Sequence, residues 1–248
     1  MDLALEVGVS PRHLSFVETG RSRPSPELVL ALADRLDVPL RARNMMLLAA
    51  GYAPKFSHLD LDDEQMRPAR AAITRILDAH DPYPGVAIDR QWNIIIANRA
   101  AHALLDGVPD HVLAPLVNVF RVCLHPDGLA GRTRNFAEWS SYLLGQMHRT
   151  IIMSGDAQLA ALEREVLAYG NVPPTARTPA PEEWGEPPIL VPLELDLGPT
   201  CLSLFTTLTT FGTPRDVTLD ELAIELFFPA DDSSEAILRQ SATPAVAH

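Results

Sequence analysis

The chain has 248 residues, of which 47% are hydrophobic and 21% are charged, and its formal net charge is −12. This composition excludes a disordered chain, and no apolar run approaches the roughly 18 residues that a membrane helix needs. The start lacks a basic-then-apolar leader and the only cysteines are Cys123 and Cys201, so we expect a cytoplasmic protein with reduced core thiols and no disulfide framework.

The charge is distributed unevenly along the chain. Residues 1–50 contain six arginines and six acidic residues, so the whole charge of −12 lies in residues 51–248. An acidic surface repels the phosphate backbone. Any contact with nucleic acid is therefore expected within the first fifty residues.

Short helices are predicted throughout these first fifty residues. Apolar residues over 3–17 follow helical spacing that is interrupted at Gly8, as in a tight corner between two helices. Ser10-Pro11 and Ser25-Pro26 each place a capping side chain before a proline, which predicts the start of a helix. Another helix is expected over residues 40–50.

Residues 3–39 read LALEVGVSPRHLSFVETGRSRPSPELVLALADRLDVP and closely resemble the Cro/repressor-type (XRE) helix-turn-helix family. In that family the helix after the turn lies in the major groove. The resemblance implies a helix-turn-helix DNA-binding domain at residues 1–52, in which Arg12 contacts a guanine. The alternative is that the arginines are solvated surface charges. Base or phosphate contacts are predicted for Ser10, Pro11, Arg12, His13, Ser15, Phe16, Arg21, Arg23 and Ser25.

The helix-turn-helix domain departs from the family pattern at its start. The family has a helix before the position of Leu3, whereas this chain begins at Met1, inside the second helix. We therefore expect weak stability and weak DNA binding from residues 1–50 as written. A misassigned start, a clipped chain and a real loss of part of the DNA reader are three open alternatives.

The second half opens with a helix and a hairpin. Residues 53–63 are predicted to be a linker and residues 64–80 a helix. Short apolar and β-branched runs predict strands over 86–88 and 92–97. Asn98 follows the second strand and is placed to cap the next helix.

The remaining elements alternate between helices and strands. The ending is ambiguous, because Thr218-x-x-Glu221 suits a helix start while Ile224, Phe227 and Phe228 suit a strand, and we favour the strand. Residues 241–248 are expected to be a disordered tail. The other predictions are helices over 136–153 and 156–168, a proline-rich loop over 172–188, and strands over 189–195 and 202–211.

The order strand, turn, strand, Asn, helix resembles the opening of a PAS domain, and its context resembles the ligand-binding domain of MmyB-like transcription regulators. The resemblance implies an α-helical helix-turn-helix head followed by an α+β PAS-like domain, an antiparallel sheet with flanking helices, at residues 64–240. It also implies a fatty-acid-like ligand. The matching motifs are Asn118-Val119-Phe120-Arg121, His125-Pro126-Asp127-Gly128, Glu138-Trp139 and the segments 209–214 and 227–231.

A sensor of this class needs an apolar pocket with a few orienting polar groups. We expect Arg121 with Asn118 to hold a carboxylate head, because positions i and i+3 share a helical face. Arg99 and His125 are alternatives for the head, and the apolar candidates have the alternative role of filling the core. The predicted ligand-binding residues are Trp92, Ile94, Ile96, Asn118, Phe120, Arg121, Leu143, Met147, Leu204 and Phe205.

The sequence predicts no enzyme, metal site or cofactor. It lacks the common nucleophile, phosphate-loop, dinucleotide and zinc motifs, and its eight histidines show no metal spacing. A haem ligand at His102 or His125 is a minor alternative. We expect a homodimeric, ligand-responsive transcription regulator that binds double-stranded operator DNA and a small apolar ligand, with no membrane contact. The alternative is a sensing or protein-interaction module that does not bind DNA because its head is incomplete.

Overall fold

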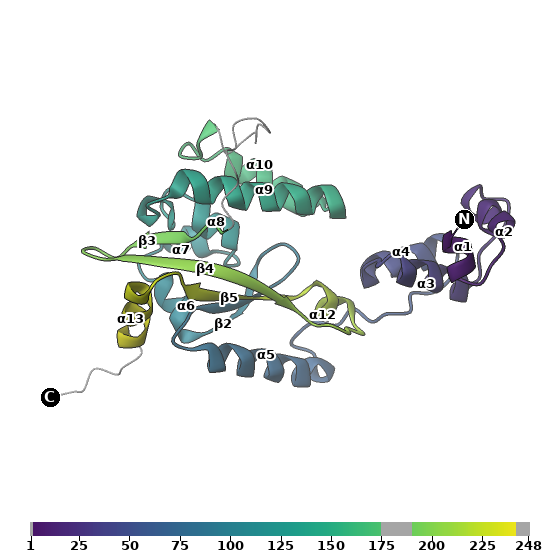
Figure 1. Cartoon of the computed structure of the whole chain (residues 1–248), viewed down its shortest axis with the longest axis horizontal. Helices are drawn as coiled ribbons and strands as arrows, with labels where there is room; N and C mark the ends of the chain where they lie inside the picture. Colours follow the sequence, from purple (N-terminus) through teal and green to yellow (C-terminus); the bar gives the residue numbers. More distant parts are fainter. Residues whose placement is uncertain (1, 175–189, 242–248) are drawn as a thin grey trace. The chain divides into compact units, whose positions relative to one another are not determined.

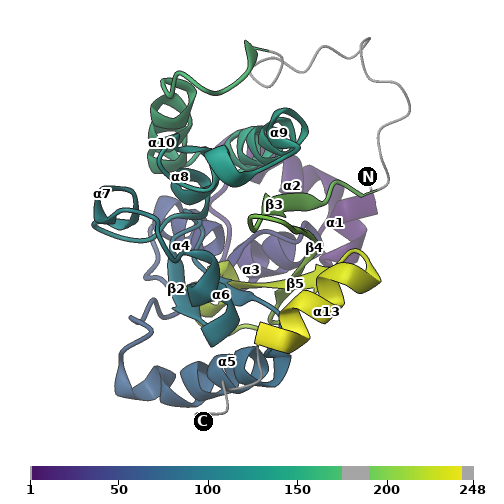
Figure 2. The same ribbon diagram turned by 90° about the vertical axis from the view of Figure 1, so that its left-hand side faces the viewer.

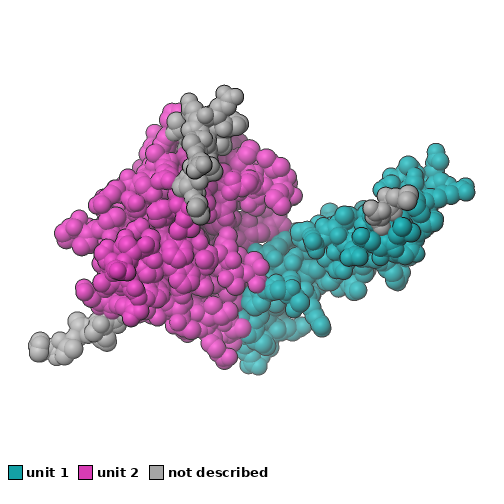
Figure 3. All heavy atoms as spheres, viewed as in Figure 1, with its two compact units in different colours: residues 1–70, 211–221 teal, residues 71–210, 222–248 magenta. Residues whose placement is uncertain are grey.

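The computed structural model describes residues 2–174 and 190–241 (Figure 1). The chain divides into two compact units, and we describe each by itself (Figure 3). Unit 1 contains residues 1–70 and 211–221, and unit 2 contains residues 71–210 and 222–248. The predicted tail beyond residue 241 and most of the predicted proline-rich loop lie outside the described residues.

Unit 1 begins with the helices that the sequence predicts. The side chain of Ser10 accepts a hydrogen bond from the His13 amide at 3.2 Å, and Ser25 caps the next helix in the same way. Gly8 makes the corner between the first two helices with a φ of +72°, which favours glycine. The helices are α1 (Asp2–Glu6), α2 (Pro11–Glu18), α3 (Pro26–Arg35) and α4 (Leu40–Ala49). Their buried residues are Ala4, Leu28, Val29, Leu32, Ala33, Leu40 and Leu47.

Residues 211–221 also belong to unit 1, and we call them the clasp. The clasp ends in the short helix α12 (Val217–Glu221). Its Val217 amide donates to the Ser57 carbonyl at 2.9 Å, and the buried carboxylate of Asp216 accepts from the Leu59 amide at 3.2 Å. The clasp therefore binds the segment that follows α4, which the sequence predicts to be a linker.

Unit 2 is built on a five-stranded sheet in which every neighbouring pair is antiparallel. The spatial order of its strands is β2-β1-β5-β4-β3. The predicted α+β class is thereby confirmed, and the ambiguous ending is a strand, as favoured. The strands are β1 (Gly85–Ile88), β2 (Ile94–Ala97), β3 (Leu193–Asp196), β4 (Cys201–Thr210) and β5 (Ala223–Pro229).

Helices cover the sheet on both faces. Figures 1 and 2 place α8, α9 and α10 over one face, which we call the core face, and α5 against the other. No helix in the described parts of the chain has the length and apolar character needed to cross a membrane. The remaining elements are η1 (Glu64–Met66), α5 (Arg67–His80), α6 (Arg99–Leu104), α7 (Asp110–Leu113), α8 (Val119–Leu124), η2 (Ala130–Arg132), α9 (Phe136–Ser154), α10 (Ala157–Leu167) and α13 (Asp232–Ser241).

Candidate functional site

The side chains of helix α2 are accessible to solvent. None of its residues is buried, and Arg12, near its N-terminus, is exposed. The Arg12 guanidinium lies 5.3 Å from the centroid of the half-buried Phe16 ring, a cation–π contact that holds the cation over the helix surface. Ser15 and Pro11 are exposed and His13 is half-buried. The predicted base-reading residues thus share one accessible helix.

The remaining predicted DNA contacts differ in their surroundings. The Ser10 and Ser25 oxygens accept backbone hydrogen bonds as caps, and each hydroxyl keeps its own proton to donate. Arg21 is exposed. Arg23 instead donates from Nε to the Ala50 carbonyl at 2.6 Å and from Nη2 to the Gly51 carbonyl at 2.8 Å. Arg23 therefore satisfies carbonyls at the end of α4, where a cation is favoured.

The structure brings most of the predicted pocket residues into one core. Phe120, Met147 and Leu204 are fully buried, and Leu143 lies with them between the core face and α8 and α9. The Trp92 ring packs 5.0 Å from the Phe120 ring, centroid to centroid. Ile94 is half-buried against the same cluster.

Ile96 and Phe205 do not join that core. Phe205 follows Leu204 directly in β4, so its side chain points to the opposite face. In β2 a bulge interrupts the pairing, with Ile88 opposite Ile94 but Ala87 opposite Ile96. The extra residue breaks the simple alternation that would have put Ile94 and Ile96 on one face.

The predicted head-group pair, Asn118 and Arg121, already has partners within the protein. Asn118 caps α8 through its side-chain oxygen, which accepts from the Phe120 amide at 3.1 Å. Arg121 forms a two-pronged ion pair with Glu165, at 2.7 and 2.9 Å. The hydrogen bonds from Arg121 lower the pKa of Glu165, and the same contact raises the pKa of Arg121. The alternative candidate Arg99 forms an ion pair with Asp81.

Sequence reasoning missed a buried polar group at the centre of the sheet. Glu225 is the single charged residue of β5, and it pairs with Val86 and Leu208 in the register of the core face. Its Oε2 atom is buried with no hydrogen-bond partner, as is the indole nitrogen of Trp139 on α9. Burial raises the pKa of Glu225 to about 7. A charged residue inside the run AIELFFP was the available signal.

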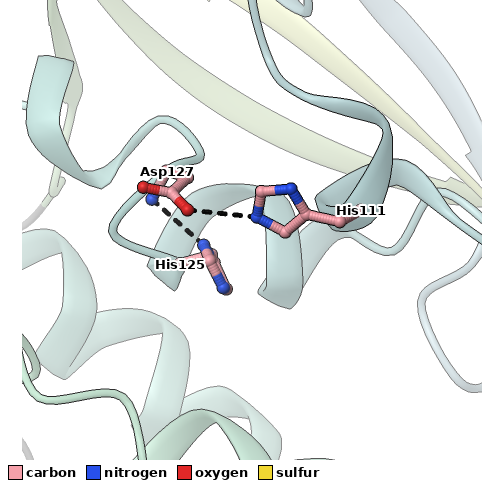
Figure 4. Close-up of side chains that lie close together, drawn as sticks. All are labelled: His111, His125 and Asp127. Carbon is pink, nitrogen blue, oxygen red and sulfur yellow. Dashed lines mark hydrogen bonds and ion pairs between the residues drawn. The ribbon is translucent and has the colours of Figure 1, made fainter.

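His111 and His125, whose spacing in the sequence does not predict a metal site, lie close together in the structure (Figure 4). Ligand atoms of His111, His125 and Asp127 all lie within 4.8 Å of one another, which corrects the impression of scattered histidines. His111 Nε2 lies 3.0 Å from Asp127 Oδ2, and the Asp127 amide donates to His125 Nδ1 at 3.0 Å. The hydrogen bonds within the group thus already use one ring nitrogen of each histidine.

A surface pocket of about 400 Å³ lies elsewhere on unit 2. It contains none of the predicted ligand-binding residues. Its polar lining does not suit an apolar chain. The pocket is lined by Arg134, Glu194, Thr200, Cys201, Ser203, Asp231, Ser233 and Ile237.

Comparison with protein-family models gives two matches. Residues 69–240 match the MmyB-like transcription regulator ligand binding domain, and residues 2–42 match a helix-turn-helix family. The first match alone covers more than half of the chain. Both are regulator domains rather than enzyme families. No curated protein matches the chain.

Proposed function

The chain belongs to the MmyB-like transcription regulators and carries an XRE-type helix-turn-helix head. From this premise we propose that it is a cytoplasmic, homodimeric regulator whose affinity for its operator changes when it binds a fatty-acid-like molecule. The helix-turn-helix match over the exposed basic start of α2 carries the DNA-binding part of this proposal. Two heads of a dimer would read half-sites about 34 Å, one helical turn, apart.

The apolar core of unit 2 supports an apolar ligand. The side chains that gather there are large and mainly aliphatic or aromatic, among them Phe120, Leu143 and Met147. An acyl chain that replaced part of this packing would stabilise its complex by about 0.8 kcal/mol for each buried methylene. The match to a ligand-binding domain family is the reason for regarding this core as a candidate pocket.

The clasp connects two strands of the sheet to α4 of the helix-turn-helix head, so it could transmit the effect of ligand binding. Strands β4 and β5 of the sheet are joined through residues 211–221, which pack in unit 1. There the Asp220 carboxylate accepts from the Leu40 amide at 2.7 Å, at the start of α4, and Glu221 binds Arg41 at 2.6 and 2.8 Å. We propose that a ligand-dependent shift of these strands changes the position of α4 and so the population of heads that fit the operator.

A protein-interaction module without DNA binding is the second candidate. It is favoured by the net charge of −12 and by the neutral balance of the first fifty residues. The two candidates differ in one measurable property, because DNA binding through phosphate contacts weakens steeply with salt.

Fluorescence anisotropy on DNA from the chain's own promoter region tests the proposal. We expect binding with a negative slope against salt, and a change in affinity when C12–C18 fatty acids are added. Arg12→Ala should weaken binding, whereas Glu138→Gln, an exposed change on α9, should not. Absence of any salt-dependent binding would favour the interaction module, and unchanged operator affinity with every acid would remove the fatty-acid part.

A further inference from the structure

Three side chains of types that bind metal ions meet at the turn that follows α8 (Figure 4). Ligand atoms of His111, His125 and Asp127 all lie within 4.8 Å of one another. His111 Nε2 is 3.0 Å from Asp127 Oδ2, and the two histidine rings lie 5.4 Å apart, centroid to centroid. In a tetrahedral zinc site, ligand atoms about 2.0–2.1 Å from the ion are about 3.3 Å from one another. The distance between His111 and Asp127 is close to this value, and small side-chain movements would bring the third ligand atom to it.

The backbone that carries His125 and Asp127 is held firmly against α8. The Gly128 amide donates to the His125 carbonyl at 2.9 Å. The Leu129 amide donates to the Val122 carbonyl at 2.7 Å. A Cβ atom at position 128 would collide with that same Val122 carbonyl, so the close approach requires glycine. One compact turn thus places two of the three ligands, which reduces the ordering that binding of an ion requires.

Neighbouring residues hold the two histidines in place. The ring of His125 packs edge-on against Tyr169, with centroids 4.8 Å apart, and the Tyr169 hydroxyl donates to Glu165 at 2.9 Å. His111 lies on α7 next to Val112, which is buried in the core of unit 2. Outer contacts of this kind orient the residues that bind a metal ion. Both rings are therefore positioned before any ion binds.

The hydrogen bonds of the group show which atoms a metal ion would use. His125 Nδ1 accepts from the Asp127 amide at 3.0 Å, so the neutral ring carries its proton on Nε2 and a lone pair on Nδ1. The ionised Asp127 carboxylate is only an acceptor, so His111 Nε2 donates to it. When the His111 proton moves to Nδ1, the other neutral tautomer, Nε2 gains the lone pair that an ion requires. An ion would thus take the place of these two hydrogen bonds.

We propose that His111, His125 and Asp127 bind a divalent transition-metal ion, and that this ion is Zn²⁺. Two imidazoles and a carboxylate form a mixed nitrogen and oxygen set that suits Zn²⁺, whereas Mg²⁺ and Ca²⁺ prefer oxygen ligands. His111 and Asp127 are exposed, so water completes the coordination of the ion. The net charge of −12 in residues 51–248 also favours a cation. The bound ion joins α7 to the turn after α8, and neither operator binding nor a fatty-acid-like ligand is needed for this site.

Titration of the metal-free full chain with Zn²⁺, in competition with a chromogenic chelator, tests the proposal. We expect one equivalent of Zn²⁺ to bind, and an excess of Mg²⁺ to leave it bound. Long-range proton–nitrogen NMR spectra of the histidine rings should show the signals of His111 and His125 shifting together up to one equivalent. Absence of saturable Zn²⁺ binding would overturn the proposal.

Three variants assign the binding to the named residues. His111→Gln and Asp127→Asn each remove one ligand at an exposed position, where little packing is lost. Each should weaken Zn²⁺ binding at least about tenfold, since loss of an outer contact alone costs about 10–100-fold in metal affinity. His148→Gln should bind like the wild type. His148 is the matched control because it pairs with Glu163 at 3.0 Å with its side chain 60% exposed, against 59% for His111, and no third ligand among the described residues joins that pair.

The contrary outcomes are equally specific. Wild-type affinity in either His111→Gln or Asp127→Asn would overturn the three-residue site. An equal loss of affinity in His148→Gln would do the same, because the ion would then bind to isolated pairs of histidine and carboxylate. Thiolate-to-metal charge-transfer absorption on addition of Co²⁺ would place the ion on a cysteine instead and would also overturn the proposal.

Discussion

The buried carboxyl of Glu225 makes the stability of unit 2 depend on pH. Its pKa is raised from 4.5 to about 7, mainly because burial disfavours the charged form. The folded chain keeps this proton to a higher pH than the unfolded chain does, so the stabilisation is complete below pH 4.5 and is lost as the pH rises through about 7. At about 1.4 kcal/mol per pKa unit, the loss amounts to about 3 kcal/mol.

Glu225→Gln removes the ionisation and keeps the size of the side chain. The free energy of unfolding of the variant minus that of the wild type should therefore increase by about 3 kcal/mol between pH 4.5 and pH 7.5. Urea titrations followed by tryptophan fluorescence measure it, because Trp92 and Trp139, the tryptophans within the described residues, both belong to unit 2. Glu138→Gln is the control. A difference that stays flat, or one that decreases as the pH rises, would refute the argument from burial.

Three other predictions test the head, the clasp and the hairpin. Arg12→Ala should cost about 1–3 kcal/mol of operator binding, whereas Arg21→Ala should mainly reduce the salt slope by about one, both by anisotropy; equal effects would contradict the assigned roles. Glu221→Gln should weaken the pair with Arg41 and leave ligand binding unchanged while reducing the response of operator affinity to ligand; a full response would remove the clasp from the mechanism. Asn118→Ala should lower the free energy of unfolding by about 2 kcal/mol in urea titrations, since it removes a cap and two hydrogen bonds to the hairpin; no loss would show that the cap is dispensable.

Local signals in the sequence predicted local structure well. Ser10, Ser25 and Asn98 each cap the helix that they were expected to cap, because a capping bond joins a side chain to a backbone amide three residues away or fewer. The order of the strands along the chain and the class of the second domain also follow from patterns within single segments. The family resemblance to residues 3–39 and to the later motifs agrees with the matched families.

Pairings between distant segments were not predictable in the same way. The sequence predicts that Arg121 holds a ligand head, but its partner Glu165 lies 44 residues further along the chain. The bulge opposite Ala87 and Ile88 depends on how two strands align, and it moved Ile96 away from the core face. The burial of Glu225 Oε2 without a hydrogen-bond partner follows only from how the covering elements pack on the sheet.

The clasp limits how such regulators can be recombined. Residues 211–221 lie deep within the second domain of the sequence, yet they bind α4 and the segment around Ser57. A chimera cut between the two matched families would join a foreign head to a clasp shaped for another partner. An exchange of the head of this chain would keep these contacts only if residues 40–59 and 211–221 were transferred together.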